Sequence, residues 1–200
     1  MNNYLRENTY YPISEEDIEK FAHSAEHQGH PGLEYHVTKD KNLIRTTFVK
    51  NMIRLGRKLG LKLNTVGMFT GQPGCVTSRH IDGTPEHSFT WRVAYYAKGE
   101  PAPITWFKPV DSDKAVRLQE IEHTGDIRDA PPAGYTVVEA DEVAHTEMLD
   151  MHSAFVRTNH PHQLDMTNTS ESRLTITATF TPEITWEELN EKLDELERNN

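Results

Sequence analysis

The sequence predicts a mainly β protein, a jelly roll of about eight core strands flanked by helices, and three observations support this fold class. Eight short segments between residues 63 and 181 are rich in Val, Ile, Thr, Tyr, Phe and Trp, as strands are. Turn sequences such as Gly71-Gln72-Pro73-Gly74 separate them. No helix-length periodic segment lies between them, which disfavours parallel βαβ units and favours an antiparallel sandwich or barrel.

The eight strands are expected at 63–70, 75–81, 89–97, 103–108, 115–122, 134–140, 152–158 and 172–181. The last segment has the clearest pattern, because successive side chains of a strand point to opposite faces. One of its faces is apolar, with Leu174, Ile176, Ala178 and Phe180, and the other carries Arg173, Thr175, Thr177 and Thr179. The apolar face requires a core, whereas the polar face is compatible with solvent or with a polar cavity.

Three helices are expected outside the strand region. The first begins at Ser14, where Ser14-Glu15-Glu16-Asp17 resembles a capping box with Asp in place of Glu, and ends near His27. The second spans 42–59 and ends at Gly60, with apolar residues at helical spacing: Ile44, Phe48, Met52, Leu55 and Leu59. The third runs from the capping box at Thr185 to about Arg198.

The chain of 200 residues is expected to form one domain, with a helical support at 1–62, a jelly-roll core at 63–181 and a C-terminal helix at 182–200. A net charge of −10 disfavours binding to nucleic acids or to an anionic membrane. A single cysteine, Cys75, excludes an internal disulfide and favours a reducing compartment. Neither a signal peptide nor a membrane span is evident, so a cytoplasmic location is expected.

Histidines and one aspartate suggest a metal centre in the strand region. His80 and Asp82 lie two residues apart in an extended segment, so their side chains point to the same side. A third ligand is available downstream, where His160 and His162 both qualify because they also lie two residues apart. Two imidazoles and one carboxylate on one face of a metal suit a non-haem Fe(II) oxygenase.

These residues resemble the signature of a known superfamily. His80-Ile81-Asp82, then His162, then Arg173-Leu174-Thr175 are similar to the H-x-D…H…R-x-S/T pattern of the Fe(II)- and 2-oxoglutarate-dependent dioxygenases, over roughly residues 63–181. The resemblance implies a double-stranded β-helix, and its spacing from histidine to arginine selects His162 over His160. The segment after His162 is also similar to the prolyl-hydroxylase-like and aspartyl/asparaginyl-hydroxylase-like branches.

The resemblance also implies the cofactors and the reaction. His80, Asp82 and His162 would bind Fe(II), leaving three positions on the ion for the cosubstrate 2-oxoglutarate and for O₂. Arg173 would pair with the distal carboxylate of 2-oxoglutarate. Further hydrogen bonds to this cosubstrate are expected from Thr175, Tyr95 and Thr105. The expected reaction is hydroxylation of a C–H bond, with release of succinate and CO₂.

Substrate recognition is less constrained by the sequence. Trp91, Arg92 and Trp106 are expected to shape substrate binding, because they lie near the metal ligands in the predicted strands. Segments 1–40, 83–90 and 109–133 are expected to set specificity. A small molecule, an amino acid, or a peptide or protein side chain fits the acidic composition better than a nucleic acid does.

Two alternatives involve the same residues. The chain could be a non-catalytic, cupin-like binding protein with a structural metal, or a zinc hydrolase or isomerase of the cupin type in which the triad holds an activated water. Arg173 distinguishes the oxygenase from the binding protein, because a structural metal has no need of a cation a ligand's length away. We therefore expect the environment of Arg173 to be as informative as the triad.

Overall fold

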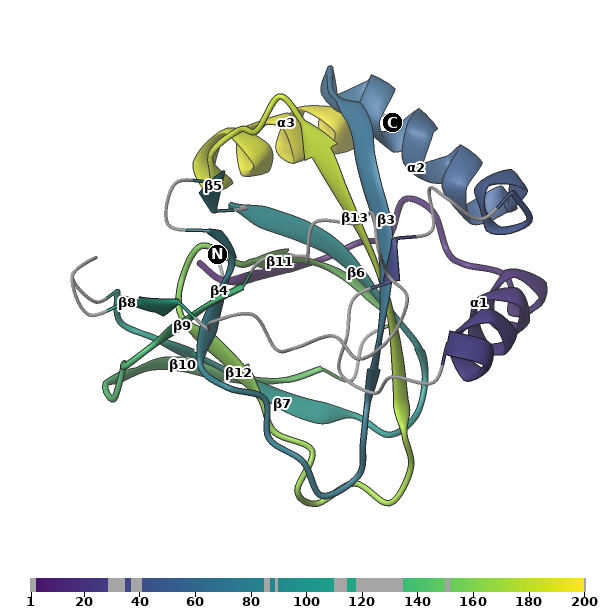
Figure 1. The fold of residues 1–200 in the computed structure, drawn as a ribbon. Helices are drawn as coiled ribbons and strands as arrows, with labels where there is room; N and C mark the ends of the chain where they lie inside the picture. The colour runs from purple at the N-terminus through teal and green to yellow at the C-terminus, as the bar shows by residue number, and fades with distance from the viewer. Residues whose placement is uncertain are drawn as a thin grey trace.

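Two antiparallel sheets pack face to face in the computed structural model of the protein (Figure 1), which confirms the predicted jelly-roll class. The structure describes residues 3–28, 35–36, 41–84, 87–88, 90–109, 115–117, 135–149 and 152–199. Within these ranges three α-helices accompany the sheets, one of them at the C-terminus. No helix in these ranges combines the length and the apolar character needed to cross a membrane.

The first sheet has six strands, and the last strand of the chain lies inside it. Its order is β1 (Leu5–Glu7), β11 (Ser153–Arg157), β6 (Trp91–Lys98), β13 (Arg173–Thr181), β3 (Lys62–Gly71) and β2 (Tyr35–His36). β13 pairs with β3 on one side and β6 on the other, so Thr175 has Phe69 and Tyr96 as its two cross-strand partners. These two pairings place side chains of three strands next to one another on one face.

The second sheet carries the predicted metal ligands. Its order is β10 (Val143–Leu149), β7 (Ala102–Phe107), β12 (His162–Leu164), β4 (His80–Thr84), β9 (Tyr135–Val138) and β8 (Ala115–Arg117), with β5 (His87–Ser88) paired to β4. His162 on β12 is the direct partner of His80 on β4. Strands far apart in the sequence therefore become neighbours at the histidines.

Several strand predictions were wrong in position. The strand expected at 75–81 begins only at His80. Residues before it contact the end of β12 and the residues that follow through an isolated bridge between Val76 and Asp165 and through single bonds such as Thr77 N–H to the Leu164 carbonyl at 2.9 Å. The segments predicted at 115–122 and 134–140 contribute β8 and β9, which extend the second sheet beyond β4. Residues 118–122 and 134 lie outside the described ranges.

β10 and β12 were not predicted, although both belong to the second sheet. β10 pairs with β7 along its length. Its sequence mixes polar and apolar residues on both faces, and Val143 and Met148 are exposed. β12 is only three residues long, which is too short to show an alternation.

The α2 helix (Thr47–Leu59) covers one face of the first sheet and begins later in the chain than predicted. Thr46 caps it through a hydrogen bond from Val49 N–H, and Gly60 ends it with a left-handed φ of 72°. Because the helix starts after Thr46, Ile44 lies in a preceding 3-10 turn, Leu43–Arg45, and is 44% exposed. The prediction that Ile44 belongs to the apolar stripe is therefore wrong.

Asp17 links α1 (Glu15–Gln28) to α2. The Ser14 hydroxyl accepts the Asp17 N–H at 3.2 Å, as predicted for the start of this helix. The Asp17 carboxylate accepts the Phe48 N–H, in the first turn of α2, at 2.7 Å. A buried side chain of one helix thus satisfies a free N–H group of another.

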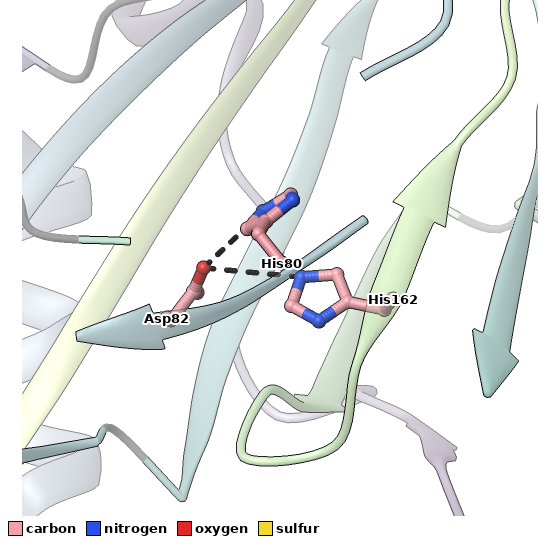
Figure 2. A group of neighbouring side chains, drawn as sticks. All are labelled: His80, Asp82 and His162. Carbon is pink, nitrogen blue, oxygen red and sulfur yellow. Dashed lines mark ion pairs between the residues drawn. The ribbon is translucent and has the colours of Figure 1, made fainter. Parts of the chain in front are cut away.

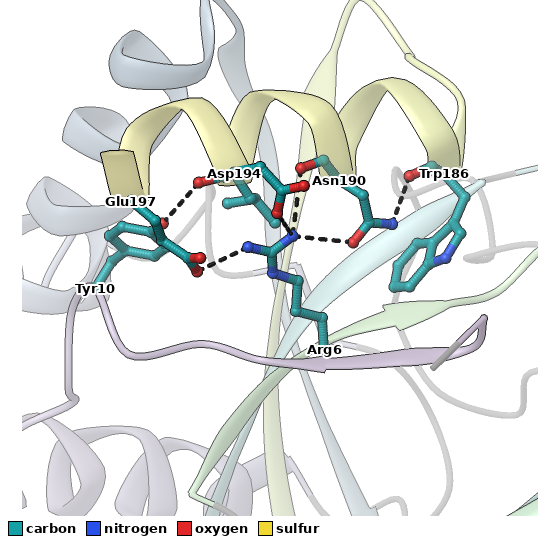
Figure 3. Close-up of polar contacts among 7 residues, drawn as sticks. Arg6, Tyr10, Trp186, Asn190, Asp194 and Glu197 are labelled. Atoms are coloured by element: carbon teal, nitrogen blue, oxygen red, sulfur yellow. Dashed lines mark hydrogen bonds and ion pairs between the residues drawn. The ribbon is translucent and has the colours of Figure 1, made fainter. Parts of the chain in front are cut away.

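The C-terminal helix α3 (Trp186–Arg198) has the predicted capping box between Thr185 and Glu188. It is also joined to β1 by Arg6, which contacts Asp194 and Glu197 at 2.7 Å each and the Asn190 side chain at 3.2 Å (Figure 3). This network connects the ends of the chain and lies on elements other than the strands that carry the histidines.

The two faces of the first sheet pack against different layers. Its apolar residues on β3, β6, β11 and β13 form one large core with α2 and α3, which lie on the side away from β7 and β12 (Figure 1). The predicted apolar set of β13, Leu174, Ile176, Ala178 and Phe180, belongs entirely to this core. A smaller cluster, with Ala94, Ala154, Ile104 and Trp106 among its members, lies between the sheets.

Candidate metal centre

His80, Asp82 and His162 converge between the two sheets (Figure 2). Asp82 Oδ1 lies 3.5 Å from His80 Nε2 and 3.8 Å from His162 Nε2, and one ligand atom from each residue lies within 4.8 Å of the others. The three side chains are only 9–18% exposed. In the described part of the chain this is the group of His, Cys, Asp and Glu side chains that has the geometry to hold a metal ion.

Backbone carbonyls orient both imidazoles. His80 Nδ1 lies 2.6 Å from the Ser78 carbonyl oxygen, and His162 Nδ1 lies 2.9 Å from that of His160. A carbonyl can only accept, so each Nδ1 carries the proton and donates it. The Nε2 atoms of both rings face Asp82, which is the arrangement found around metal-binding histidines.

The Asp82 carboxylate is ionised and has two different surroundings. Burial alone would raise its pKa, but Arg92 and the two imidazoles outweigh burial and hold the pKa of Asp82 below its usual value. Arg92 Nε lies 2.6 Å from Oδ2, whereas Oδ1 faces the histidines. One carboxylate oxygen is thus held by a buried cation, and the other is directed towards the space between the imidazoles.

His162 has the protonation state of a metal ligand. Burial and the neighbouring His80 lower the pKa of His162 to about 4, so its ring is neutral at pH 7. A neutral imidazole and an ionised carboxylate are the forms that bind metals. The donor set of two imidazole nitrogens and one carboxylate oxygen fits non-haem Fe(II), with further positions on the ion left open.

Arg173 lies at the start of β13 and points into the space between the sheets. Its guanidinium carbon lies 4.2 Å from the centre of the Tyr96 ring, and Nη2 donates to the Leu149 carbonyl at 3.4 Å. The residue is 2% exposed, yet Nη1 has no hydrogen-bond partner among the described residues. Burial, which Tyr96 only partly offsets, lowers the pKa of Arg173. A buried cation lacking a carboxylate partner is costly, so this position suits an anionic ligand.

A continuous set of contacts connects the triad to Arg173. Arg92, which holds Asp82, lies over the Phe69 ring at 5.8 Å, and Arg173 lies over the Tyr96 ring. Phe69 and Tyr96 are the two cross-strand partners of Thr175. Thr175 therefore lies between the rings that the two arginines cover, on the face of β13 that carries Arg173. The structure brings Thr175 into the neighbourhood where the sequence predicted it.

Two of the predicted cosubstrate contacts lie on other faces. Tyr95 is buried on the helical side of the first sheet, where its hydroxyl donates to the Tyr11 carbonyl at 2.7 Å and accepts from Asn8. Thr105 lies on the outer face of the second sheet and contacts Thr146 Oγ1 at 3.0 Å. The predicted roles of Tyr95 and Thr105 are therefore wrong, and the reason is strand parity, since Tyr96 rather than Tyr95 faces Arg173.

The residues expected to bind substrate have other partners. Trp91 stacks on Phe180 in the helical core, with ring centres 5.5 Å apart, and donates to the Ile184 carbonyl. Trp106 faces the inside of the sandwich, fully buried, and donates to the Arg157 carbonyl at 2.9 Å. Arg92 pairs with Asp82. Trp91 faces away from the centre, so its predicted role in substrate binding is wrong. Trp106 and Arg92 face the interior, and the roles predicted for them stay predictions.

His160, the alternative third ligand, contributes through its backbone. Its carbonyl accepts the His162 Nδ1–H, whereas its ring makes an edge contact with Tyr4 at 5.4 Å. Burial and the nearby Arg157 lower the pKa of His160 to about 4. His162 is the histidine placed with His80 and Asp82, as the resemblance predicted. Of the segments expected to set specificity, residues 1–2, 29–34, 37–40, 85–86, 89, 110–114 and 118–133 lie outside the described ranges.

Phe69 and Tyr96 are the residues near the centre that the sequence analysis missed. Tyr96 could have been found by counting in twos from Arg92, because alternate residues of a strand share a face. Phe69 had no such signal, since its position depends on which strand pairs with β13. Both rings lie against the buried cations described above.

No protein-family model matches the sequence, and a search of curated proteins also gave no match. Among solved structures, AviO1 from Streptomyces viridochromogenes Tue57 has 9% identity and a TM-score of 0.50, with 90% of this chain and 91% of that chain covered. This likeness shows a shared fold. A Pseudomonas putida prolyl-4-hydroxylase (11% identity, 87% and 82% covered, TM-score 0.44) and apo HygX from Streptomyces hygroscopicus (10%, 89% and 81%, 0.46) also match.

The fold and the triad agree with the resemblance stated from the sequence. The eight strands β3, β4, β6, β7, β10, β11, β12 and β13 form two opposed sheets, and the ordered ligand set His80, Asp82 and His162 lies between them. The jelly-roll fold that the resemblance implied is thus confirmed, and the three residues that it implied as ligands lie within reach of one another.

Proposed function

We propose that the protein is an Fe(II)- and 2-oxoglutarate-dependent oxygenase that hydroxylates a C–H bond of a small molecule, an amino acid, or a peptide or protein side chain. The observation that supports this most strongly is the buried Arg173, whose Nη1 has no hydrogen-bond partner in the described residues and which shares one interior with the His80–Asp82–His162 triad. A purely structural metal site gives no reason for that cation. The same holds for a zinc-bound water.

Different residues would bind the metal ion and the cosubstrate. His80, Asp82 and His162 would hold Fe(II) through two nitrogens and one oxygen, which leaves positions for a chelating 2-oxo acid and for O₂. Arg173 would pair with the distal carboxylate of 2-oxoglutarate, and Thr175, the cross-strand partner of Tyr96, would donate from its hydroxyl to the same ligand. When bound, Fe(II) and 2-oxoglutarate supply the oxidation of the C–H bond, with release of succinate and CO₂.

The protein itself supplies orientation and a dry environment. Ile104, Trp106 and Leu164 line the interior next to β12, and Trp106 is fully buried. Apolar walls exclude water and strengthen the pairing between Arg173 and a carboxylate. The backbone carbonyls of Ser78 and His160 keep both imidazole rings turned towards the shared space.

Anaerobic addition of Fe(II) and 2-oxoglutarate to the purified protein tests the proposal. The expected result is a weak metal-to-ligand charge-transfer band in the visible, which is lost in His162→Ala. Its absence from the wild-type protein would contradict the proposal. Metal analysis alongside would identify zinc, if a zinc hydrolase were the correct description.

Arg173 gives a sharper version of the same test. Arg173→Met should raise the KM for 2-oxoglutarate by about 10- to 100-fold, because a hydrogen bond to a charged group contributes about 1.5–3 kcal/mol. Arg6→Gln is the control, because Arg6 is an arginine whose partners are acidic residues of α3 and it lies on β1, on another part of the first sheet. An unchanged KM in Arg173→Met would exclude the proposed carboxylate contact.

The substrate can be sought through turnover. Small molecules, free amino acids and peptides would be screened for compounds that stimulate succinate formation, and hydroxylated products would be identified by mass spectrometry. Stimulation by a compound of one class, with a mass gain of one oxygen, would assign the substrate class.

A further inference from the structure

The two oxygens of Asp82 have different partners, and this difference bears on how the carboxylate can bind a metal. Oδ1 lies 3.5 and 3.8 Å from the two Nε2 atoms, in the space that the triad encloses. Oδ2 lies 2.6 Å from Arg92 Nε, on the other side of the carboxylate. A carboxylate that binds a metal through both oxygens needs both of them on the same side as the metal.

Arg92 is held in place from several directions. Its side chain is 5% exposed, and its guanidinium lies over the Phe69 ring at 5.8 Å. Its neighbours on β6, Trp91 and Val93, are buried in the helical core, which fixes the strand at this point. The long side chain therefore has little freedom to move away from Oδ2.

The backbones of β4 and β6 are also connected next to this pair. Asp82 N–H donates to the Thr158 carbonyl at 3.1 Å, and Thr158 N–H donates to the Thr90 carbonyl at 3.0 Å. Thr90 lies two residues before Arg92. The positions of Asp82 and Arg92 are thus set by hydrogen bonds that do not involve either side chain.

Asp82 and Arg92 also carry opposite charges. A buried carboxylate lacking a counter-ion is costly, and Arg92 supplies that counter-ion in the folded chain before any metal binds. Because Oδ2 stays with Arg92, a metal ion at the triad meets Oδ1 alone.

We propose that Arg92 is a positioning residue that restricts Asp82 to binding the metal through one oxygen, and thereby keeps a third position on the ion open. Three donor atoms leave three positions on a six-coordinate ion, and a carboxylate bound through both oxygens would leave two. A chelating 2-oxo acid fills two positions, so O₂ would have none. This inference deepens the proposed function and rests on it for the identity of the cosubstrate.

Mn(II) provides a test that needs no cosubstrate. The protein would be loaded with Mn(II), which also favours six oxygen or nitrogen donors, and its bound waters would be counted from the broadening of the EPR lines in ¹⁷O-enriched water. We expect three bound waters in the wild-type protein and two in Arg92→Met, where Oδ2 is free to turn to the metal. Arg92→Lys, which retains a cation, should restore three.

Matched controls and contrary results follow from the same measurement. Arg6→Gln removes an arginine with acidic partners on another part of the first sheet and should keep three bound waters. Three waters in Arg92→Met, or two in Arg92→Lys, would overturn the proposal. If Arg92→Met does not fold, the number of waters bound to Mn(II) in the wild-type protein still tests the proposal. Two bound waters in the wild-type protein would overturn it as well.

A second measurement addresses the open position directly. Nitric oxide would be added anaerobically to the Fe(II) and 2-oxoglutarate complex as a substitute for O₂, and its binding followed by EPR. Arg92→Met should retain the charge-transfer band but bind nitric oxide at least tenfold more weakly than the wild-type protein. A retained band with unchanged nitric oxide affinity would overturn the role of Arg92, whereas a missing band in the wild-type protein would overturn the proposed function.

Discussion

The two faces of the first sheet are built from alternate residues of the same strands but have different chemistry. On β6, Trp91, Val93 and Tyr95 face the helices and are buried in a large apolar core. Arg92 and Tyr96, from the same strand, face the second sheet and contact Asp82 and Arg173. The helical face therefore carries the large apolar core, and the inner face carries the charged side chains of the candidate metal centre.

Alternate residues of one strand thus contribute either to the apolar core or to the candidate metal centre, according to the face of the sheet on which they lie. A substitution on the helical face should lower stability and leave the chemistry per folded molecule unchanged, whereas one at the triad should do the reverse. Four substitutions test this difference between the faces, and they follow in decreasing order of expected effect.

The largest effect is expected at the triad. His80→Ala should weaken Fe(II) binding and turnover by more than about 100-fold, because even partners that only orient metal ligands contribute 10- to 100-fold. The Tm measured with a chelator present should change little, since His80 is partly exposed and its main partner is a backbone carbonyl. Titration calorimetry would measure the affinity, with the exposed His152→Ala as control. A large decrease in Tm would contradict the separation of stability from metal binding.

The opposite outcome is expected in the helical layer. Leu55 on α2 is fully buried, and Leu55→Ala should lower the free energy of unfolding by about 2–5 kcal/mol. Urea denaturation would measure this change, and kcat at a temperature where the variant is folded should match that of the wild-type protein. Ile53→Ala on the same helix, at a position 38% exposed, should cost far less. A lowered kcat in folded Leu55→Ala would show that the two faces are coupled.

A smaller effect is expected where two helices meet. Asp17→Ala removes the acceptor of the Phe48 N–H and should lower the free energy of unfolding by about 1–2 kcal/mol, as does the loss of a helix cap. Glu19→Ala, at an exposed position of the same helix, should leave the stability nearly unchanged. Equal effects of the two substitutions would show that the contact between α1 and α2 contributes nothing.

The smallest effect concerns pH and the cap of α3. The Thr185 N–H, which Glu188 accepts at 2.8 Å, lowers the pKa of the Glu188 carboxyl. A carboxyl whose pKa is lower in the folded state stabilises the fold above its unfolded pKa, and this contribution is lost as the pH falls through the folded pKa. Glu188→Gln should therefore lower Tm slightly at pH 7 and not at acidic pH, with Glu191→Gln as control. A deficit independent of pH would contradict this account.

The sequence predicts those features of the molecule that depend on residues close together in the chain. The capping box at Thr185, the alternation of β13 and the pair His80 and Asp82 depend on neighbours in the chain, and the structure has all of them. The choice of His162 needed the resemblance as well, because His160 has the same local environment. Its ring instead turns to Tyr4, a contact that depends on the N-terminal segment.

The predictions were wrong where the position of a residue depends on which strands pair in the folded protein. Tyr95 and Tyr96 are adjacent residues of the same type, so the sequence does not distinguish them. Only the pairing of β6 with β13 shows that Tyr96 faces Arg173. β10 has a mixed polar pattern because it pairs only with β7 among the described strands. The contact of Arg92 with Asp82 joins two sheets, so no spacing in the chain predicts it.

The ion pair between Arg92 and Asp82 has a consequence for the order in which the protein is assembled. Because the aspartate already has its counter-charge and both imidazoles are held by backbone carbonyls, the chain can reach its native state before it meets a metal. Iron would then be loaded into a finished site and could be withdrawn again without unfolding the chain, unlike the zinc of a zinc finger. Iron supply would thus set the fraction of active molecules and leave the amount of folded protein unchanged.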